Sequence, residues 1–265
     1  MWPSIRSWNT QFHLSTYASS LRDAVISNRT KLSKSRFPTT SNNPKSNPYL
    51  YNVRFHKCRR STGLLGLKSL GKLMNSYSML GYSGYGLGVL GLLLKWGFTP
   101  NVISLTSLIR ALCKELRVDK AVLLFHKMER DFGCAPDVVA YGTLLKGLCS
   151  AGNSRMAVNL HERIVGGTFG CVADLQPDVI CYNTLIDGLC KDGFVSKAKE
   201  LFHEMREKDI APNVVTYNTL IDGLCKNGEW DEAKATFYEM IDQRVTPDEI
   251  TFTVLINTLG KIAKE

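Results

Sequence analysis

The sequence predicts an all-α fold, an α-solenoid of antiparallel helix-turn-helix repeats of about 35 residues, preceded by a disordered N-terminal leader. Three observations predict it. Landmark residues recur every 35 or 36 positions, apolar residues within each repeat follow the spacing of a buried helical face, and basic residues are concentrated in the first 60 of the 265 residues. Together they divide the chain into a leader and an array of repeats.

Residues 1–60 have the composition of an organellar transit peptide. They hold eleven Lys or Arg, ten Ser and one acidic residue, Asp23, whereas residues 61–265 hold 22 basic and 23 acidic side chains. The formal net charge of +9 therefore belongs to the leader and does not indicate a basic nucleic-acid-binding face on the repeats. A leader rich in Arg and Ser and poor in acids predicts import into an organelle, with an untargeted basic tail as the alternative.

Prolines and an aromatic position mark the repeat. Pro177, Pro212 and Pro247 are 35 residues apart, and the same spacing relates Tyr182, Tyr217 and Phe252. One earlier unit carries six extra residues, which we place in the Gly-containing stretch 166–176. We expect a leader at 1–60, a degenerate first repeat at 61–101, and a solenoid at 102–265 with units 102–137, 138–178, 179–213, 214–248 and a partial unit 249–265.

Each unit is expected to form two helices. In 214–248, Tyr217, Leu220, Ile221 and Leu224 follow the i, i+3, i+4, i+7 spacing of one buried helical face. Gly228 suits the left-handed turn that ends this helix. The same turn holds Gly81, Gly152 and Gly193 in other units, and Leu116 in unit 102–137. Because one hairpin cannot bury its own apolar face, we expect the hairpins to stack.

Two patterns suggest chemistry but are better explained by packing. Gly86, Gly88 and Gly91 match the dinucleotide-binding pattern GxGxxG, yet they fall in an expected second helix and not between a strand and a helix. Four of the eight Cys recur at one position of the buried helical face, where a thiol packs as a small apolar group. These four are Cys113, Cys149, Cys190 and Cys225.

No residue pattern predicts catalysis or a cofactor. His126, His161 and His203 are distributed one per repeat, so they should lie on the order of 10 Å apart, too far to share a metal ion. No apolar run approaches the roughly 18 residues of a membrane-spanning helix. We therefore expect no enzymatic activity, no metal, no cofactor and no membrane association.

The unit 214–248, VVTYNTLIDGLCKNGEWDEAKATFYEMIDQRVTPD, closely resembles the consensus of the P-class pentatricopeptide repeat family. The resemblance covers about 67–265 and is strong from residue 102. The chain is also similar to plant restorer-of-fertility-like members, which are mostly mitochondrial. The resemblance implies a sequence-selective protein that binds single-stranded organellar RNA and acts in RNA processing, stability or translation. It also implies a mitochondrial location in preference to the plastid.

In that family two side chains per repeat select one base, namely the residue after the aromatic position and the residue after the closing proline. The resemblance implies that Asn218 with Asp248 favours U, and that Asn183 with Asn213 favours C and then U. Thr106 with Asp137 should favour G, while Gly142, paired with Asp178, departs from the pattern because it has no side chain. Thr253 is the equivalent residue of the partial unit.

The resemblance also assigns flanking and phosphate-binding residues. The apolar residues two positions before the aromatic should flank the bases: Ile103, Val139, Ile180, Val215 and Ile250. A basic residue near the end of the first helix should meet phosphate groups: Lys114, Lys191 and Lys226.

Other interpretations of these residues stay open at this point. Asp or Asn after proline is a common helix N-cap, and Lys near a helix C-terminus complements the helix dipole. The alternative for the whole chain is a protein-binding scaffold of tetratricopeptide type, whose 34-residue period and Trp-containing signature this sequence does not match.

Overall fold

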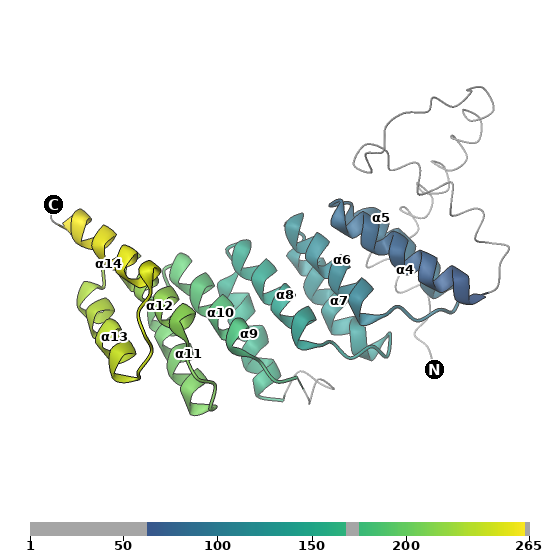
Figure 1. Cartoon of the computed structure of the whole chain (residues 1–265). Helices are drawn as coiled ribbons and strands as arrows, with labels where there is room; N and C mark the ends of the chain where they lie inside the picture. The colour runs from purple at the N-terminus through teal and green to yellow at the C-terminus, as the bar shows by residue number, and fades with distance from the viewer. Residues whose placement is uncertain (1–62, 168–174, 263–265) are drawn as a thin grey trace, which may run out of the picture. The chain divides into compact units, whose positions relative to one another are not determined.

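The computed structural model describes residues 63–167 and 175–262, and its regular elements there are eleven helices with no strand (Figure 1). The predicted all-α solenoid of helical hairpins is thereby confirmed. The leader 1–60 and most of the extra segment 166–176 lie outside the described residues. The chain forms two compact units that divide between Pro136 and Asp137.

The first unit contains two helical hairpins. Its helices are α4 (Gly63–Met79), α5 (Ser83–Lys95), α6 (Val102–Lys114) and α7 (Val118–Arg130). Helix α4 packs against α5 and α6, and α6 packs against α7. A Cβ atom added at Gly86 would lie 2.8 Å from Cδ1 of Leu108, so this glycine allows α5 to approach α6 closely. The GxGxxG pattern lies wholly inside α5, where it serves helix packing.

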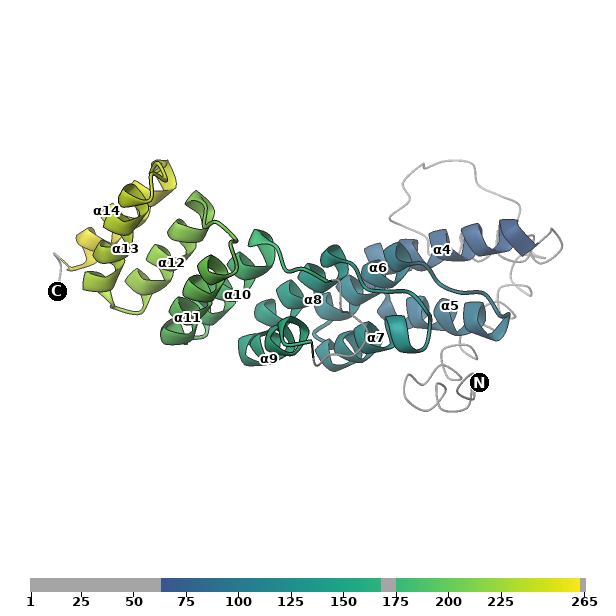
Figure 2. The ribbon, with the colours of Figure 1, turned by 90° about the horizontal axis from the view of Figure 1, so that it is seen from below.

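The second unit is built in the same way. Its helices are α8 (Val138–Ser150), α9 (Ser154–Val165), α10 (Val179–Lys191), α11 (Val195–Glu207), α12 (Val214–Lys226), α13 (Trp230–Asp242) and α14 (Glu249–Ile262). The first helices α8, α10, α12 and α14 pack consecutively, and α9, α11 and α13 each pair with the first helix that precedes them (Figures 1 and 2). Tyr141, Tyr182 and Tyr217, at the aromatic position, are fully buried between neighbouring helices.

The turn inside each hairpin has a left-handed residue. Gly81, Gly152, Gly193 and Gly228 have φ between 70° and 81°, as the sequence predicted. Leu116 adopts φ 57° at the same place, although a side chain disfavours this conformation by about 1–2 kcal/mol. The packing of α6 against α7 therefore imposes the turn even without glycine.

The Gly-Leu-Cys sequence that recurs near the end of α8, α10 and α12 contributes to helix packing. A Cβ atom added at Gly188 would lie 2.6 Å from Cβ of Cys149, and one added at Gly223 would lie 2.5 Å from Cβ of Cys190. Each cysteine thus fills the space that a glycine of the next repeat leaves open. Burial raises the pKa of the Cys190 thiol to about 12, so it stays neutral and packs as an apolar group, as predicted.

Polar contacts between successive repeats supplement this packing. Helices α5 and α9 have no side-chain cap from their own N-cap residue. Instead, the backbone N–H of Ser83 donates to Oε1 of Glu115 at 2.6 Å, and that of Ser154 donates to Oδ2 of Asp192 at 3.2 Å. Both acids stand just after the first helix of the next repeat. In these two places the following repeat therefore caps the second helix of the one before it.

Candidate functional site

An apolar side chain is exposed at the second residue of every first helix from α6 onward. Between 54% and 69% of the surface of these residues is exposed, whereas the valine that precedes each of them in α6, α8, α10 and α12 is partly buried. They are Ile103, Val139, Ile180, Val215 and Ile250, the residues predicted to flank bases. Folding gains nothing from an exposed β-branched residue in a helix, so this recurrence indicates a surface used for contact.

The fifth residue of each first helix lies on the same side, because three residues separate it from the second. Here the structure differs from repeat to repeat. Asn183 is half-buried, and its Oδ1 has no hydrogen-bond partner within the described part of the chain. Asn218 is only 8% exposed. Gly142, the fifth residue of α8, has no side chain, so this repeat has no polar group at this position of the surface.

Threonine occupies the fifth position in α6 and in α14. Thr106 is buried, and its hydroxyl donates to the carbonyl oxygen of Val102 at 2.8 Å. Thr253 is exposed, and its hydroxyl donates to the carbonyl oxygen of Glu249 at 2.7 Å. Both hydroxyls keep acceptor lone pairs, so a base N–H could still bind them.

The residues after the closing prolines all cap the helix that follows. Oδ1 of each accepts the backbone N–H three residues later, at distances of 2.7 to 3.1 Å. The capping residues are Asn101, Asp137, Asp178, Asn213 and Asp248. The N-cap interpretation is thus confirmed. Capping uses one oxygen, so each aspartate keeps Oδ2 as a possible acceptor for a ligand.

One predicted base-selecting pair is joined directly. Nδ2 of Asn218 donates to Oδ1 of Asp248 at 2.9 Å, and the hydroxyl of Thr251 donates to Oδ1 of Asn218 at 2.6 Å. Hydrogen bonds from the backbone of Thr251 and from Asn218 hold the pKa of Asp248 below its ordinary value. The aspartate is therefore ionised at neutral pH, and it can only accept hydrogen bonds. No comparable bond links Asn183 to Asn213 among the described residues.

Basic residues line the same side of the first helices, but their electrostatic environments differ. Lys191 and Lys226 are exposed and form ion pairs with Asp187 and Asp222, four residues earlier in the same helix. Helix α6 carries Arg110 as well as Lys114 and no acid, and α8 carries Lys146 and no acid.

Sequence reasoning missed Arg110 and Lys146. Both are exposed at the ninth position of a first helix, where the later repeats carry Asp187 and Asp222. The ninth residue of a helix follows the second by seven residues, which is about two turns. These side chains therefore project on the same side as the exposed apolar residues. Aligning the repeats by helix position would have found them.

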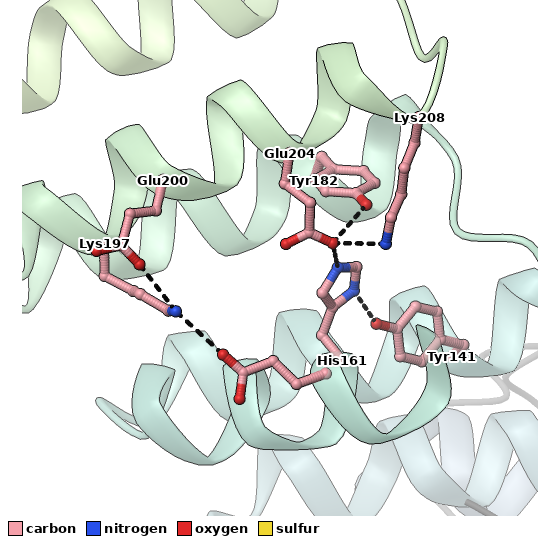
Figure 3. A network of polar contacts seen from close by, with 8 residues as sticks. Tyr141, His161, Tyr182, Lys197, Glu200, Glu204 and Lys208 are labelled. Atoms are coloured by element: carbon pink, nitrogen blue, oxygen red, sulfur yellow. Dashed lines mark hydrogen bonds and ion pairs between the residues drawn. The ribbon is translucent and has the colours of Figure 1, made fainter. Parts of the chain in front are cut away.

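The most extensive buried polar network joins four helices of the second unit (Figure 3). His161 of α9 is fully buried, and its Nδ1 lies 2.7 Å from the Tyr141 hydroxyl. Its Nε2 lies 3.6 Å from Oε1 of Glu204, which also accepts from the Tyr182 hydroxyl at 3.2 Å and from Nζ of Lys208 at 2.7 Å. Burial lowers the pKa of His161, although the nearby Glu204 opposes this effect. The network links two repeats. His161 and the two tyrosines are buried, whereas Glu204 is half-buried and Lys208 is exposed.

Neither a metal cluster nor a membrane-spanning helix is found in residues 63–167 and 175–262. No group of three or more His, Cys, Asp or Glu in these ranges is arranged to hold a metal ion. No helix there is both long enough and apolar enough to cross a bilayer.

Comparison with protein families gives matches over most of the repeat region. The model of the PPR repeat family matches residues 100–150, 177–226 and 212–261, and a model described as PPR repeat matches residues 139–166. A mitochondrial pentatricopeptide repeat-containing protein of Arabidopsis thaliana is 33% identical over 116 residues, which are 44% of this chain and 13% of the relative. A second Arabidopsis protein with pentatricopeptide repeats is 46% identical over 57 residues, 21% of this chain and 12% of its own length. The chain thus spans a small part of these relatives.

Solved structures with the same fold include the pentatricopeptide repeat protein PPR10 from maize. Its crystal structure matches with a TM-score of 0.67 and 21% identity over 94% of this chain and 36% of PPR10. PPR10 in complex with an 18-nucleotide psaJ RNA element matches with a TM-score of 0.57 and 22% identity, over 97% of this chain and 38% of that one. The repeat domain of the Arabidopsis protein-only RNase P 1, in complex with tRNA, matches with a TM-score of 0.57 and 15% identity, over 73% of this chain and 98% of that domain.

Proposed function

The chain belongs to the pentatricopeptide repeat family, and from this premise we propose that it binds single-stranded RNA in a sequence-selective manner, as a P-class, restorer-of-fertility-like member. The observation that carries the proposal is the exposed Ile or Val at the second position of every first helix from α6 to α14. Unstacked bases need apolar surfaces to lie against, and this fold supplies one per repeat.

Base selection is proposed to come from the polar residues beside each apolar contact. Asn218 with Asp248 is proposed to read U, and Asn183 with Asn213 to read C and then U. An amide can donate and accept, and so can match the Watson–Crick edge of a pyrimidine. Thr106 with Asp137 is proposed to read G, whereas Gly142 with Asp178 leaves its base unselected, and Thr253 begins a further unit.

Phosphate contacts are proposed to be unequal along the repeats. Arg110, Lys114 and Lys146 belong to helices without acids, so they attract phosphate with their full charge. Lys191 and Lys226 must first exchange their paired aspartates for phosphate, and such exposed pairs are weak enough to exchange. Contacts of this kind position the strand without reading its sequence.

The direct test is a titration of the full chain with a short single-stranded RNA that carries G, any base, C and U in that order. Binding should weaken when the C and U are replaced by purines. Each replacement should cost about 1–3 kcal/mol, as a mismatch does in nucleic-acid recognition. Equal affinity for duplex DNA, or no binding at low salt, would refute the proposal. A protein-binding scaffold of tetratricopeptide type would show no RNA binding at low salt.

The matched control compares two charge variants. Changing both Arg110 and Lys146 to Gln should reduce the salt dependence of RNA binding by about 0.7 logarithmic units for each phosphate that the protein no longer neutralises. Changing both Lys191 and Lys226 to Gln should reduce it less, because their charges are already partly neutralised.

We further propose that the protein acts on organellar transcripts in mitochondria, in RNA processing, stability or translation. The support is the basic, Ser-rich composition of residues 1–60 and the mitochondrial designation of a relative. Fusing residues 1–60 to a fluorescent protein in plant cells tests it. Fluorescence in mitochondria is expected, and fluorescence in plastids or the cytosol would contradict the proposal.

A further inference from the structure

We propose that Thr251 is a positioning residue for base selection, and that it fixes the Asn218 amide so that unit 214–248 discriminates U from C more strictly than unit 179–213 does. This inference rests on the proposed RNA-binding function. It concerns a residue outside the two positions that the family resemblance assigns, because Thr251 is the third residue of the following first helix, α14.

The hydrogen bonds around Asn218 determine which way its amide points. The carboxylate of Asp248 can only accept, so the group 2.9 Å away must be the NH₂ end of Asn218. The Thr251 hydroxyl accepts the backbone N–H of Asp248 at 3.1 Å, and two oxygens can accept its own hydrogen: Oδ1 of Asn218 at 2.6 Å and Oδ1 of Asp248 at 3.0 Å. The shorter contact is the one to Asn218. Reversing the amide would remove this acceptor and would place two acceptors against each other at Asp248.

The fold brings the third residue of one first helix to the fifth residue of the previous one in other repeats as well. A Cβ atom at Gly142 would lie 3.8 Å from Sγ of Cys181. In the longer helix α4, Gly71 holds the equivalent position of the repeat, and a Cβ atom there would lie 3.4 Å from Oγ of Ser104. The Thr251 contact is therefore a regular feature of helix stacking. What varies is the chemistry that each repeat places there.

Unit 179–213 has the same kind of residue, but the structure gives Thr216 only the contact to its own capping residue and no bond to Asn183. Oγ1 of Thr216 lies 3.2 Å from Oδ1 of Asn213, and it accepts the backbone N–H of Asn213, which completes a capping box within its own helix. Oδ1 of Asn183 is left without a partner among the described residues. The Asn183 amide is consequently free to turn.

Amide orientation matters because the two pyrimidines present opposite patterns. U offers an N–H donor at N3 and an acceptor at O4, whereas C offers an acceptor at N3 and an NH₂ donor at N4. An amide that can turn matches either base. An amide that is held at both ends matches only one, so the hydroxyl of Thr251 converts a permissive position into a selective one.

The test uses the full chain and the RNA described above, with its last base either U or C. Thr251→Val removes the hydroxyl at nearly constant volume, and the preference for U over C should fall about fivefold, the effect of one hydrogen bond of ordinary strength. Thr251→Ser keeps the hydroxyl and should keep the preference. The matched control is Thr216→Val, which should leave the selection of C or U by unit 179–213 unchanged.

A second measurement does not depend on RNA. In ¹⁵N NMR spectra the Asn218 side-chain NH₂ should exchange slowly with solvent in the wild type and in Thr251→Ser, and faster in Thr251→Val. Thr251→Cys serves where the valine variant unfolds, because Cys181 shows that the fold accepts cysteine at this position. Unchanged exchange and unchanged base preference in both variants would overturn the inference. Absence of RNA binding by the wild type would instead refute the proposed function and leave the NMR result to decide the role of Thr251.

Discussion

Helices α10 and α12 end in the same ten residues, Tyr-Asn-Thr-Leu-Ile-Asp-Gly-Leu-Cys-Lys, yet their side chains meet different neighbours. The hydroxyl of Tyr182 donates to Glu204, and its ring lies edge-on to His161 at 4.9 Å between centroids. Tyr217 packs on Phe202 at 5.3 Å. Asn183 keeps an unpartnered oxygen, whereas Asn218 is bonded at both ends of its amide. In a stack of repeats the adjoining repeat thus determines the properties of identical residues.

The largest expected change in stability comes from substitutions that disrupt the glycine–cysteine packing found in both repeats. In Gly223→Ala the added methyl group would clash with Cys190, and we expect the free energy of unfolding to fall by about 2–3 kcal/mol. Gly188→Ala should cost a similar amount through Cys149. Gly142→Ala is the control, because its methyl group would meet only Sγ of Cys181 at 3.8 Å, and it should stabilise by up to about 1 kcal/mol. Urea unfolding measures all three, and equal stabilities would contradict the packing role.

The next effect separates the two asparagines. Asn218→Ala removes the acceptor that Thr251 uses, so we expect a loss of about 1–2 kcal/mol in urea unfolding. Asn183→Ala should change stability by less than about 0.5 kcal/mol or increase it, since alanine favours a helix and Oδ1 accepts no hydrogen bond there. The comparison fails if both variants lose the same stability.

A smaller effect concerns pH. Burial depresses the pKa of His161 in the folded state. Below the ordinary histidine pKa of about 6.5, the unfolded chain therefore binds more protons at this residue than the folded chain does. Stability from the neutral imidazole is fully present above that pH and is lost as pH falls further. Between pH 7.5 and 5.5 we expect the wild type to lose about 1 kcal/mol more than His161→Phe. Phenylalanine is a suitable replacement, because Phe125, Phe202 and Phe237 hold the equivalent position in α7, α11 and α13.

The smallest expected effect concerns an exposed ion pair that both repeats contain. Asp222→Asn removes the exposed ion pair with Lys226, and Asp187→Asn removes the pair with Lys191. Each should lower the free energy of unfolding by about 0.3–0.5 kcal/mol, an amount that disappears in high salt. A loss above about 1 kcal/mol that persists in salt would mean that these aspartates do more than pair with their lysines.

The sequence by itself determined the helical hairpins, the buried aromatic position and the turn residues. These depend on periodic apolar residues and on local backbone preferences, both of which are visible in one repeat. The family resemblance singled out the Ile and Val residues that the structure shows to be exposed, and they fall at the same step of every repeat from residue 102 onward. The packing role of the Gly-Leu-Cys sequence could be found only in the structure, because Gly223 and Cys190, which meet there, belong to different repeats.

Only the tertiary structure decided how the candidate base-selecting residues differ. The sequence assigned Asn183 and Asn218 equivalent positions. It could not show that Thr251 bonds Asn218, whereas Thr216 bonds Asn213 and not Asn183. The same holds for His161, whose replacement of the usual Phe becomes informative only when Glu204 and Tyr141 are found beside it. Periodicity specifies which residues share a helix face, but hydrogen-bond partners depend on how neighbouring repeats pack, and small differences in that packing decide which donor reaches which acceptor.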